Sequence, residues 1–216
     1  MPEAPARRAL VFDFDGLIAD TEWPEYEAWR AVFGAAGQDL PLGDFLPAVG
    51  TPGKVDFRAL LEARMGCVPD WATLDPILEE RRRSGLAELR ILPGVRELMI
   101  EGAAHGWRIG VASSSSRAWV QGHLRRLGLD SWVEAVRTRD NVPALKPSPE
   151  PYLLVCADLG ADPLRSVAFE DSQTGVAAAR AAGLQVVAVP NRLTRSQDLS
   201  AAHFVVPDLR EFRLSA

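Results

Sequence analysis

The sequence predicts an α/β fold, in which a parallel β-sheet carries helices on both faces and a helical segment is inserted after the first strand. Three observations support this prediction. The run Ala9–Phe12 is apolar at every position, as expected for a parallel strand that is buried on both faces. Short β-rich runs then alternate with helical periods over most of the chain. The segment from Thr21 to Leu89 breaks this alternation, because it contains no convincing strand.

Five further β-rich runs are expected to complete the sheet. They are GWRIGVAS, with its strand at Trp107–Ala112, a weaker run in VEAVRT, and then SVAFEDS, LQVVAVPN and a short HFVV. Helices should lie between these strands, because apolar side chains recur there at helical spacing and a glycine follows each segment. The four expected helices begin near Val95, Val120, Pro149 and Thr174 and stop at Gly106, Gly128, Gly160 and Gly183.

The inserted segment is expected to form a helical domain of its own. Apolar side chains at helical spacing predict three helices in it, around residues 26–33, around residues 57–65 and from residue 74 onward. The chain is therefore expected to divide into a core domain, residues 1–20 and 90–216, and a helical domain, residues 21–89.

The composition is that of a soluble globular protein and argues against some classes of partner. The chain has 216 residues, of which 47% are hydrophobic and 25% charged, as in ordinary soluble globular proteins. Its formal net charge of −5 argues against nucleic acid or an anionic membrane as the main partner. No apolar run approaches the ~20 residues of a membrane-spanning helix, and no signal core precedes the first strand. We expect a cytoplasmic monomer with no nucleic-acid or membrane partner.

Acidic, hydroxyl and ammonium groups follow the predicted strands at the points where these strands end. In chain order they are Asp13 and Asp15, the serine run that begins at Ser113, Lys146 in ALKPSPEPY, and Glu170 and Asp171. Ligands of open α/β sheets bind beyond the carboxyl ends of the strands, so we expect all of these groups at one edge of the sheet.

Each of these groups alone has an ordinary explanation. A serine run before a helix usually supplies its N-cap, a single lysine in a proline-rich loop is usually solvated, and FEDS could cap another helix. Together they indicate more specific chemistry. Several carboxylates at one point require a hard cation, and oxygen ligands select Mg²⁺. An ammonium group and a helix N-terminus beside that cation suit a phosphoryl group. A carboxylate can then attack phosphorus to form an aspartyl-phosphate, and a second can protonate the leaving oxygen.

Four stretches of the chain resemble the motifs of the haloacid dehalogenase-like (HAD) hydrolase superfamily. DFDGLIADTE resembles the first motif, D-x-D-G, GVASSSS the second, LKPSPEPY the third and FEDSQTGVAAARAAG the fourth. Their order and spacing agree over about Ala9 to Asn191. The branch that the chain resembles contains phosphoglycolate phosphatase-like and β-phosphoglucomutase-like proteins with a helical cap. The resemblance implies a Rossmann-like core and a cap domain at the inserted segment.

The resemblance also implies roles for the acidic residues. Asp13 would be the nucleophile and a magnesium ligand. Asp15 would be the general acid and then the general base, with its backbone carbonyl on the metal. Asp171 would bind Mg²⁺ directly, and Glu170 would bind it directly or through water. The dehalogenases of the superfamily lack the second aspartate of the first motif, so the presence of Asp15 argues against dehalogenation.

The remaining implied roles concern the phosphoryl group and the substrate. Ser113 would donate a hydrogen bond to the transferring phosphoryl group, with help from the backbone N–H of Ser114. Lys146 would neutralise phosphoryl charge and orient Asp13. Phosphonate-cleaving members use a cap lysine as a Schiff base, and Lys54, in VGTPGKVDF, is the only lysine of the inserted segment. A solvated loop lysine is the alternative interpretation of Lys54.

The favoured function is therefore a magnesium-dependent phosphatase that acts on a small phosphorylated metabolite, such as a sugar phosphate. One alternative is a sugar-phosphate mutase of the β-phosphoglucomutase type. Another is a catalytically inactive protein that binds phosphorylated metabolites, which the retention of every motif position disfavours. The resembling β-phosphoglucomutases place a histidine five residues after the aspartate of DT, where this chain has Glu25. That difference favours hydrolysis over isomerisation.

Overall fold

The computed structural model describes residues 7–50 and 54–214, which form two compact units. The second unit is Asp20–Arg90, one residue longer at each end than the helical segment expected from the sequence. The first unit comprises the described residues before and after it. Within the first unit the chain leaves and returns at adjacent points, because Ala19 pairs with Ile91 in an isolated antiparallel bridge.

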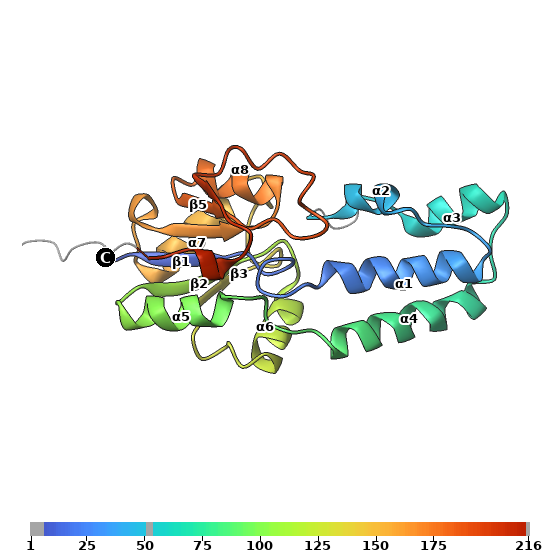
Figure 1. Ribbon diagram of the computed structural model, residues 1–216, viewed down its shortest axis with the longest axis horizontal. Helices are drawn as coiled ribbons and strands as arrows, with labels where there is room; N and C mark the ends of the chain where they lie inside the picture. The colour runs from blue at the N-terminus through green and yellow to red at the C-terminus, as the bar shows by residue number, and fades with distance from the viewer. Residues whose placement is uncertain (1–6, 51–53, 215–216) are drawn as a thin grey trace, which may run out of the picture. The chain divides into compact units, whose positions relative to one another are not determined.

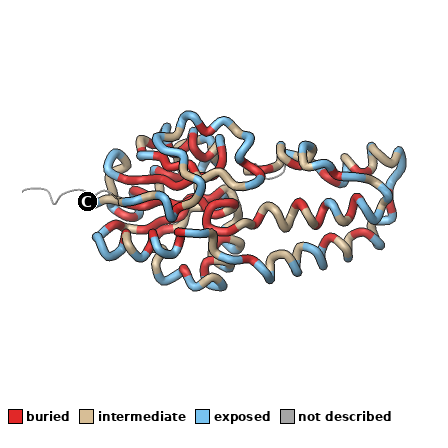
Figure 2. The backbone as a smooth tube through the Cα atoms, in the orientation of Figure 1, coloured by how far each residue is buried: buried red, intermediate tan, exposed pale blue. Residues whose placement is uncertain are grey.

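Within the described residues, six parallel strands form the sheet of the first unit, in the order β3-β2-β1-β4-β5-β6 (Figure 1). The strands are β1 (Ala9–Phe12), β2 (Arg108–Ala112), β3 (Ala135–Arg137), β4 (Val167–Glu170), β5 (Gln185–Ala188) and β6 (Phe204–Val205). All of the strands expected from the sequence are confirmed. The central strand β1 lies between β2 and β4, and each of its residues is fully buried (Figure 2).

Helices cover both faces of this sheet (Figure 1). The four helices are α5 (Val95–Ala104), α6 (Arg117–Arg126), α7 (Glu150–Leu159) and α8 (Gln173–Ala181). Alternate residues of β1 point to opposite faces, because successive side chains of a strand do so. Leu10 and Phe12 join the core beneath α5 and α6, whereas Ala9 and Val11 join the core beneath α7 and α8. The expected α/β fold class is confirmed. The described residues of this unit also form two short 3-10 helices, η2 (Pro163–Arg165) and η3 (Leu209–Glu211).

The second unit is helical throughout its described residues. It contains α1 (Glu22–Ala35), α2 (Leu42–Phe45), η1 (Leu46–Ala48), α3 (Phe57–Met65) and α4 (Trp71–Ala87). The three expected helices are present as α1, α3 and α4. The sequence analysis missed α2 and η1, which are too short to show a helical period. Phe45 of α2 nevertheless packs against Tyr26 and Phe57, with ring centroids 5.2 and 5.3 Å away, so this short helix contributes to the core of the unit.

In the part of the chain that the structure describes, no helix combines the length and the apolar character needed to span a membrane.

Candidate active site

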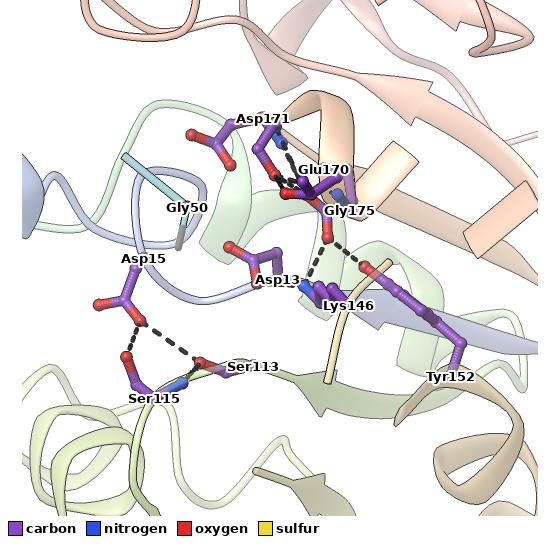
Figure 3. A network of polar contacts seen from close by, with 12 residues as sticks. Asp13, Asp15, Gly50, Ser113, Ser115, Lys146, Tyr152, Glu170, Asp171 and Gly175 are labelled. Carbon is purple, nitrogen blue, oxygen red and sulfur yellow. Dashed lines mark hydrogen bonds and ion pairs between the residues drawn. The ribbon is translucent and has the colours of Figure 1, made fainter. Parts of the chain in front are cut away.

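The strand ends of the first unit bring the acidic residues together (Figure 3). Phe12 of β1 is in register with Val111 of β2 and with Phe169 of β4. The residues that follow these three positions therefore meet at the carboxyl edge of the sheet. Asp13 continues the line of β1, since its N–H donates to the Phe169 carbonyl at 2.9 Å.

Asp13, Glu170 and Asp171 form a buried carboxylate cluster, with one oxygen of each within 4.8 Å of the others. Their exposed fractions are 7%, 0% and 2%. Lys146 brings a single ammonium group to this cluster. Its Nζ lies 2.5 Å from Asp13 Oδ1 and 2.5 Å from Glu170 Oε1, and its side chain is only 4% exposed. The cluster thus holds more negative than positive charge in a place with little access to water.

Burial and the neighbouring charges shift the pKa values of Asp13 and Lys146. Burial raises the pKa of Asp13 to about 8; the Lys146 ammonium opposes this increase, and the carboxylates of Glu170 and Asp15 add to it. Burial alone would lower the pKa of Lys146, but Asp13 and Glu170 outweigh it and raise that pKa. A divalent cation would offset the excess negative charge, and the all-oxygen donor set fits a hard cation such as Mg²⁺.

Hydrogen-bond donors contact both carboxylate oxygens of Glu170. Its Oε1 accepts from Lys146 and from the Tyr152 hydroxyl, both at 2.5 Å. Its Oε2 accepts from the Asp171 N–H and from the Ser172 hydroxyl, both at 3.2 Å. Both oxygens of Glu170 are therefore engaged, and one of them fixes Lys146.

Asp171 is positioned by the side chain of Asn191 and by the close approach of Gly16. Asn191, which follows β5, donates its side-chain N–H to Asp171 Oδ2 at 2.7 Å and to the Gly16 carbonyl at 3.1 Å. Gly16 has a φ of +82°, and a Cβ there would lie 2.4 Å from Asp171 Oδ2. Only glycine permits both this backbone conformation and this approach, which explains the glycine of the first motif.

Asp15 faces the serine run after β2 (Figure 3). Its Oδ2 accepts from the Ser115 hydroxyl at 2.5 Å and from the Ser113 hydroxyl at 3.3 Å. Its Oδ1 accepts from the indole N–H of Trp119 at 2.9 Å. Ser113 is also buried, and its hydroxyl accepts from the Ser115 N–H at 3.0 Å. The residues expected to carry the acid and the phosphoryl contact are therefore neighbours.

Two of the predicted site residues have less structural support. Ser114 is half-buried in the loop beside Ser113, where its proposed contact would use only the backbone N–H. Lys54 is exposed and belongs to the second unit, and residues 51–53 of its loop lie outside the described residues. A role for Lys54 in binding substrate stays a prediction.

The structure adds four polar residues that the sequence analysis did not assign to the site: Ser115, Trp119, Tyr152 and Asn191. Ser115 lies two residues after Ser113 in the same serine run, so a continued alternation of side-chain direction from β2 could have identified it. The other three had no such signal. Tyr152 and Trp119 are located on apolar helix faces, where an aromatic residue usually indicates core packing, and Asn191 is in a loop.

Comparison with known proteins assigns the family. The family model for haloacid dehalogenase-like hydrolases matches residues 10–189. YhcW of Bacillus subtilis, which is named as a phosphatase, is 40% identical over 187 residues, covering 87% of this chain and 85% of that protein. The fructose-1-phosphate phosphatase YqaB of Escherichia coli is 32% identical over 184 residues, covering 83% of this chain and 95% of its own length.

The fold comparison agrees with the family model. The crystal structure of CbbY from Rhodobacter sphaeroides in complex with phosphate superposes with a TM-score of 0.73 at 27% identity, covering 95% of this chain and 96% of that one. The named relatives are thus phosphatases or, as with a β-phosphoglucomutase of Mycobacterium bovis, phosphomutases. The chain belongs to the haloacid dehalogenase-like hydrolase family.

Proposed function

We propose that this protein is a magnesium-dependent phosphatase that hydrolyses a small phosphorylated metabolite through an aspartyl-phosphate on Asp13. One observation carries the proposal: a lysine with a 4% exposed side chain pairs with Asp13 inside a cluster of three buried carboxylates. Such an arrangement is costly for stability, because each buried charge loses its hydration. It suits a site that binds a cation and a phosphoryl group at the same time.

In this proposal Asp13 attacks phosphorus, and the bond between phosphorus and the leaving oxygen breaks. The proton on Asp15 passes to that leaving oxygen. Lys146 offsets charge on the phosphoryl oxygens and holds Asp13 in place, and the Ser113 hydroxyl donates to the phosphoryl group. Asp15 then takes a proton from the water that attacks the phosphorus of the aspartyl-phosphate. Inorganic phosphate and free Asp13 result, so the cycle is balanced.

Asp13, Asp171 and the backbone carbonyl of Asp15 would hold the Mg²⁺ ion, with Glu170 acting through water. When bound, the cation supplies positive charge to the phosphoryl oxygens and to the carboxylate cluster. The residues present fit this ion. Burial and the neighbouring carboxylates raise the pKa of Asp13 to about 8 despite Lys146, so the ionised form of Asp13 needs further positive charge, which the ion would supply. The second unit would supply the contacts that select the substrate, as its position in the sequence matches that of the cap in the resembling branch.

The same core chemistry could serve a mutase, and the contacts of Glu25 favour the hydrolase. Glu25 accepts from the indole N–H of Trp29 at 2.9 Å and from Arg82, whose Nε lies 2.6 Å away. Its charge is therefore engaged within the second unit. A carboxylate tied to an arginine in this way does not provide the histidine donor that the resembling β-phosphoglucomutases have at this position.

Phosphate release from a panel of sugar phosphates and other phosphomonoesters tests the proposal. We expect release from at least one sugar phosphate with Mg²⁺, none after EDTA treatment and recovery when Mg²⁺ is restored. Asp171→Ala should raise the Mg²⁺ concentration needed for half-maximal activity. A purified, folded protein that binds these metabolites without releasing phosphate would instead support the inactive binding protein.

A separate assay distinguishes phosphatase from mutase. β-Glucose 1-phosphate is supplied with a catalytic amount of the bisphosphate, and glucose 6-phosphate and free phosphate are measured together. Phosphate should be the main product. Glucose 6-phosphate formed well in excess of phosphate would overturn the choice of hydrolase.

A further inference from the structure

We infer that Trp119 is a positioning residue for the general acid, and that its indole N–H determines which oxygen of Asp15 gives the proton to the leaving group. The inference rests on the proposed function and extends it to a residue that acts through Asp15. It starts from the bond between Trp119 Nε1 and Asp15 Oδ1, which is 2.9 Å long and joins α6 to the loop after β1.

The two oxygens of Asp15 have chemically different partners. An indole N–H can only donate a hydrogen bond, whereas a hydroxyl group can donate or accept. Oδ1 accepts from the indole of Trp119, and Oδ2 contacts the hydroxyls of Ser113 and Ser115. The carbonyl oxygen of a carboxylic acid is its better acceptor, so the fixed donor favours Oδ1 as the carbonyl oxygen. The acidic proton is then best accommodated on Oδ2, beside hydroxyls that can rotate to accept it.

Trp119 can fill this role because its own ring is fixed. Ser116 caps α6, and its hydroxyl accepts from the Trp119 backbone N–H at 3.3 Å, which places the residue in the first turn of the helix. The His123 ring, one turn further along, meets the indole edge-on with centroids 4.4 Å apart and stacks over Phe14 at 6.1 Å. Burial, together with the nearby charge of Arg126, lowers the pKa of His123. The helix cap and the His123 ring therefore hold the indole in place where it meets Asp15.

The contacts of Oδ2 explain how the acid would be released for the reaction. The contact from Ser113 is the longer of the two, at 3.3 Å, and Ser113 is the residue proposed to donate to the phosphoryl group. When that hydroxyl turns to the phosphoryl oxygen, Oδ2 loses one partner while Oδ1 keeps the indole. The carboxyl group can then hand its proton from Oδ2 to the leaving oxygen as the bond from that oxygen to phosphorus breaks.

Trp119→Phe tests the inference, because it keeps an aromatic ring against His123 and removes the N–H. The assay compares an alkyl phosphate, whose leaving oxygen needs a proton, with p-nitrophenyl phosphate, whose leaving group hardly needs one. The quantity compared is kcat/KM, because it covers only the steps up to departure of the leaving group and not the later attack of water. Since general acid catalysis contributes roughly 10²–10⁴-fold, we expect kcat/KM for the alkyl substrate to fall by roughly tenfold or more and kcat/KM for the nitrophenyl substrate by less than about threefold. Both substrates are assayed on one preparation, so a misfolded fraction lowers both rates equally and leaves their ratio unchanged.

Trp107→Phe is the matched control. Trp107 is a buried tryptophan that precedes β2, at the amino edge of the sheet and away from the site. We expect its substitution to leave the ratio of the two rates unchanged. Equal losses on both substrates in Trp119→Phe, or the same change of ratio in Trp107→Phe, would overturn the inference while leaving the phosphatase intact. Failure of the proposed function would appear differently, as a wild-type protein that releases phosphate from neither substrate.

Discussion

Among the described residues, the first unit holds buried ion pairs beside several exposed ones, whereas every pair of the second unit reaches solvent. In the first unit, Lys146 pairs with Asp13 and Glu170 where the side chains are between 0% and 10% exposed. In the second unit, Arg82 pairs with Glu25 where the side chains are 40% and 36% exposed. Surface pairs contribute little to stability, and buried charges lower it unless their partners remain. The difference indicates that the first unit retains the buried charges of Asp13, Lys146 and Glu170 for chemistry, whereas pairs such as Arg82–Glu25 complete a helical surface.

The largest effect is expected from Asp13→Asn. The substitution removes the proposed nucleophile but keeps an oxygen that can accept from Lys146, so we expect turnover to fall more than about a thousandfold in a folded protein. Phosphate release measures the loss of turnover, and circular dichroism checks that the variant is folded. Substantial activity in a pure, folded variant would end the assignment of Asp13.

Lys146→Met and Arg82→Ala compare the two kinds of ion pair directly. Lys146→Met leaves buried carboxylates without their cation, which costs about 3–5 kcal/mol of unfolding free energy in metal-free protein. It should also slow turnover by about a hundredfold or more. Arg82→Ala should cost less than about 1 kcal/mol. Urea unfolding in EDTA measures the loss of unfolding free energy in each variant. Equal losses in the two variants would remove the contrast between the units.

The pH dependence of stability sharpens the same contrast. The pKa of Asp13 is raised from 3.8 to about 8, so between these values the folded, metal-free protein binds more protons at this site than the unfolded chain. This site's contribution to stability is therefore lost as pH rises through that window. We expect metal-free Asp13→Asn to lose less stability than the wild type between pH 5 and pH 8, measured by urea unfolding. Parallel curves for the two proteins would contradict the raised pKa.

The last comparison concerns one glycine in each unit. A Cβ at Gly175 would lie 1.9 Å from the Glu170 carboxylate, so Gly175→Ala should cost roughly 1–3 kcal/mol and weaken metal binding. Gly34 lies in α1 with no atom within 4 Å of an added Cβ, so Gly34→Ala should stabilise the protein by up to about 1 kcal/mol. Thermal unfolding measures the stability of both variants. If Gly175→Ala were the more stable of the two, Glu170 would be able to move aside without loss of stability.

Much of the first unit could be predicted from the sequence, because its signals are local and repeated. The apolar run Ala9–Phe12 and the glycine stops give the strands and helices, and parallel strands that end at one edge bring their following residues together. This is why Lys146 and Asp13, far apart in the chain, could be expected to meet.

The parts that could not be predicted depend on contacts between distant side chains. Tyr152 and Trp119 look like ordinary core aromatics in the sequence, and only the fold shows that their polar atoms reach Glu170 and Asp15. The short α2 also escaped prediction, because four residues show no period and its place is set by the packing of Phe45. The substrate contacts of the second unit depend on loops for which sequence offers no general code.

The central claim, that Asp13 carries the phosphoryl group and Asp15 manages the protons, is tested most directly with Asp15→Asn and p-nitrophenyl phosphate. This leaving group hardly needs a proton, so the first step should still occur, whereas the attack of water should lack its base. We predict a burst of one nitrophenol per protein followed by slow turnover, with the phosphoryl group found on the peptide that contains Asp13 after acid quenching. Steady turnover without a burst, or a phosphoryl group on any other residue, would contradict the account.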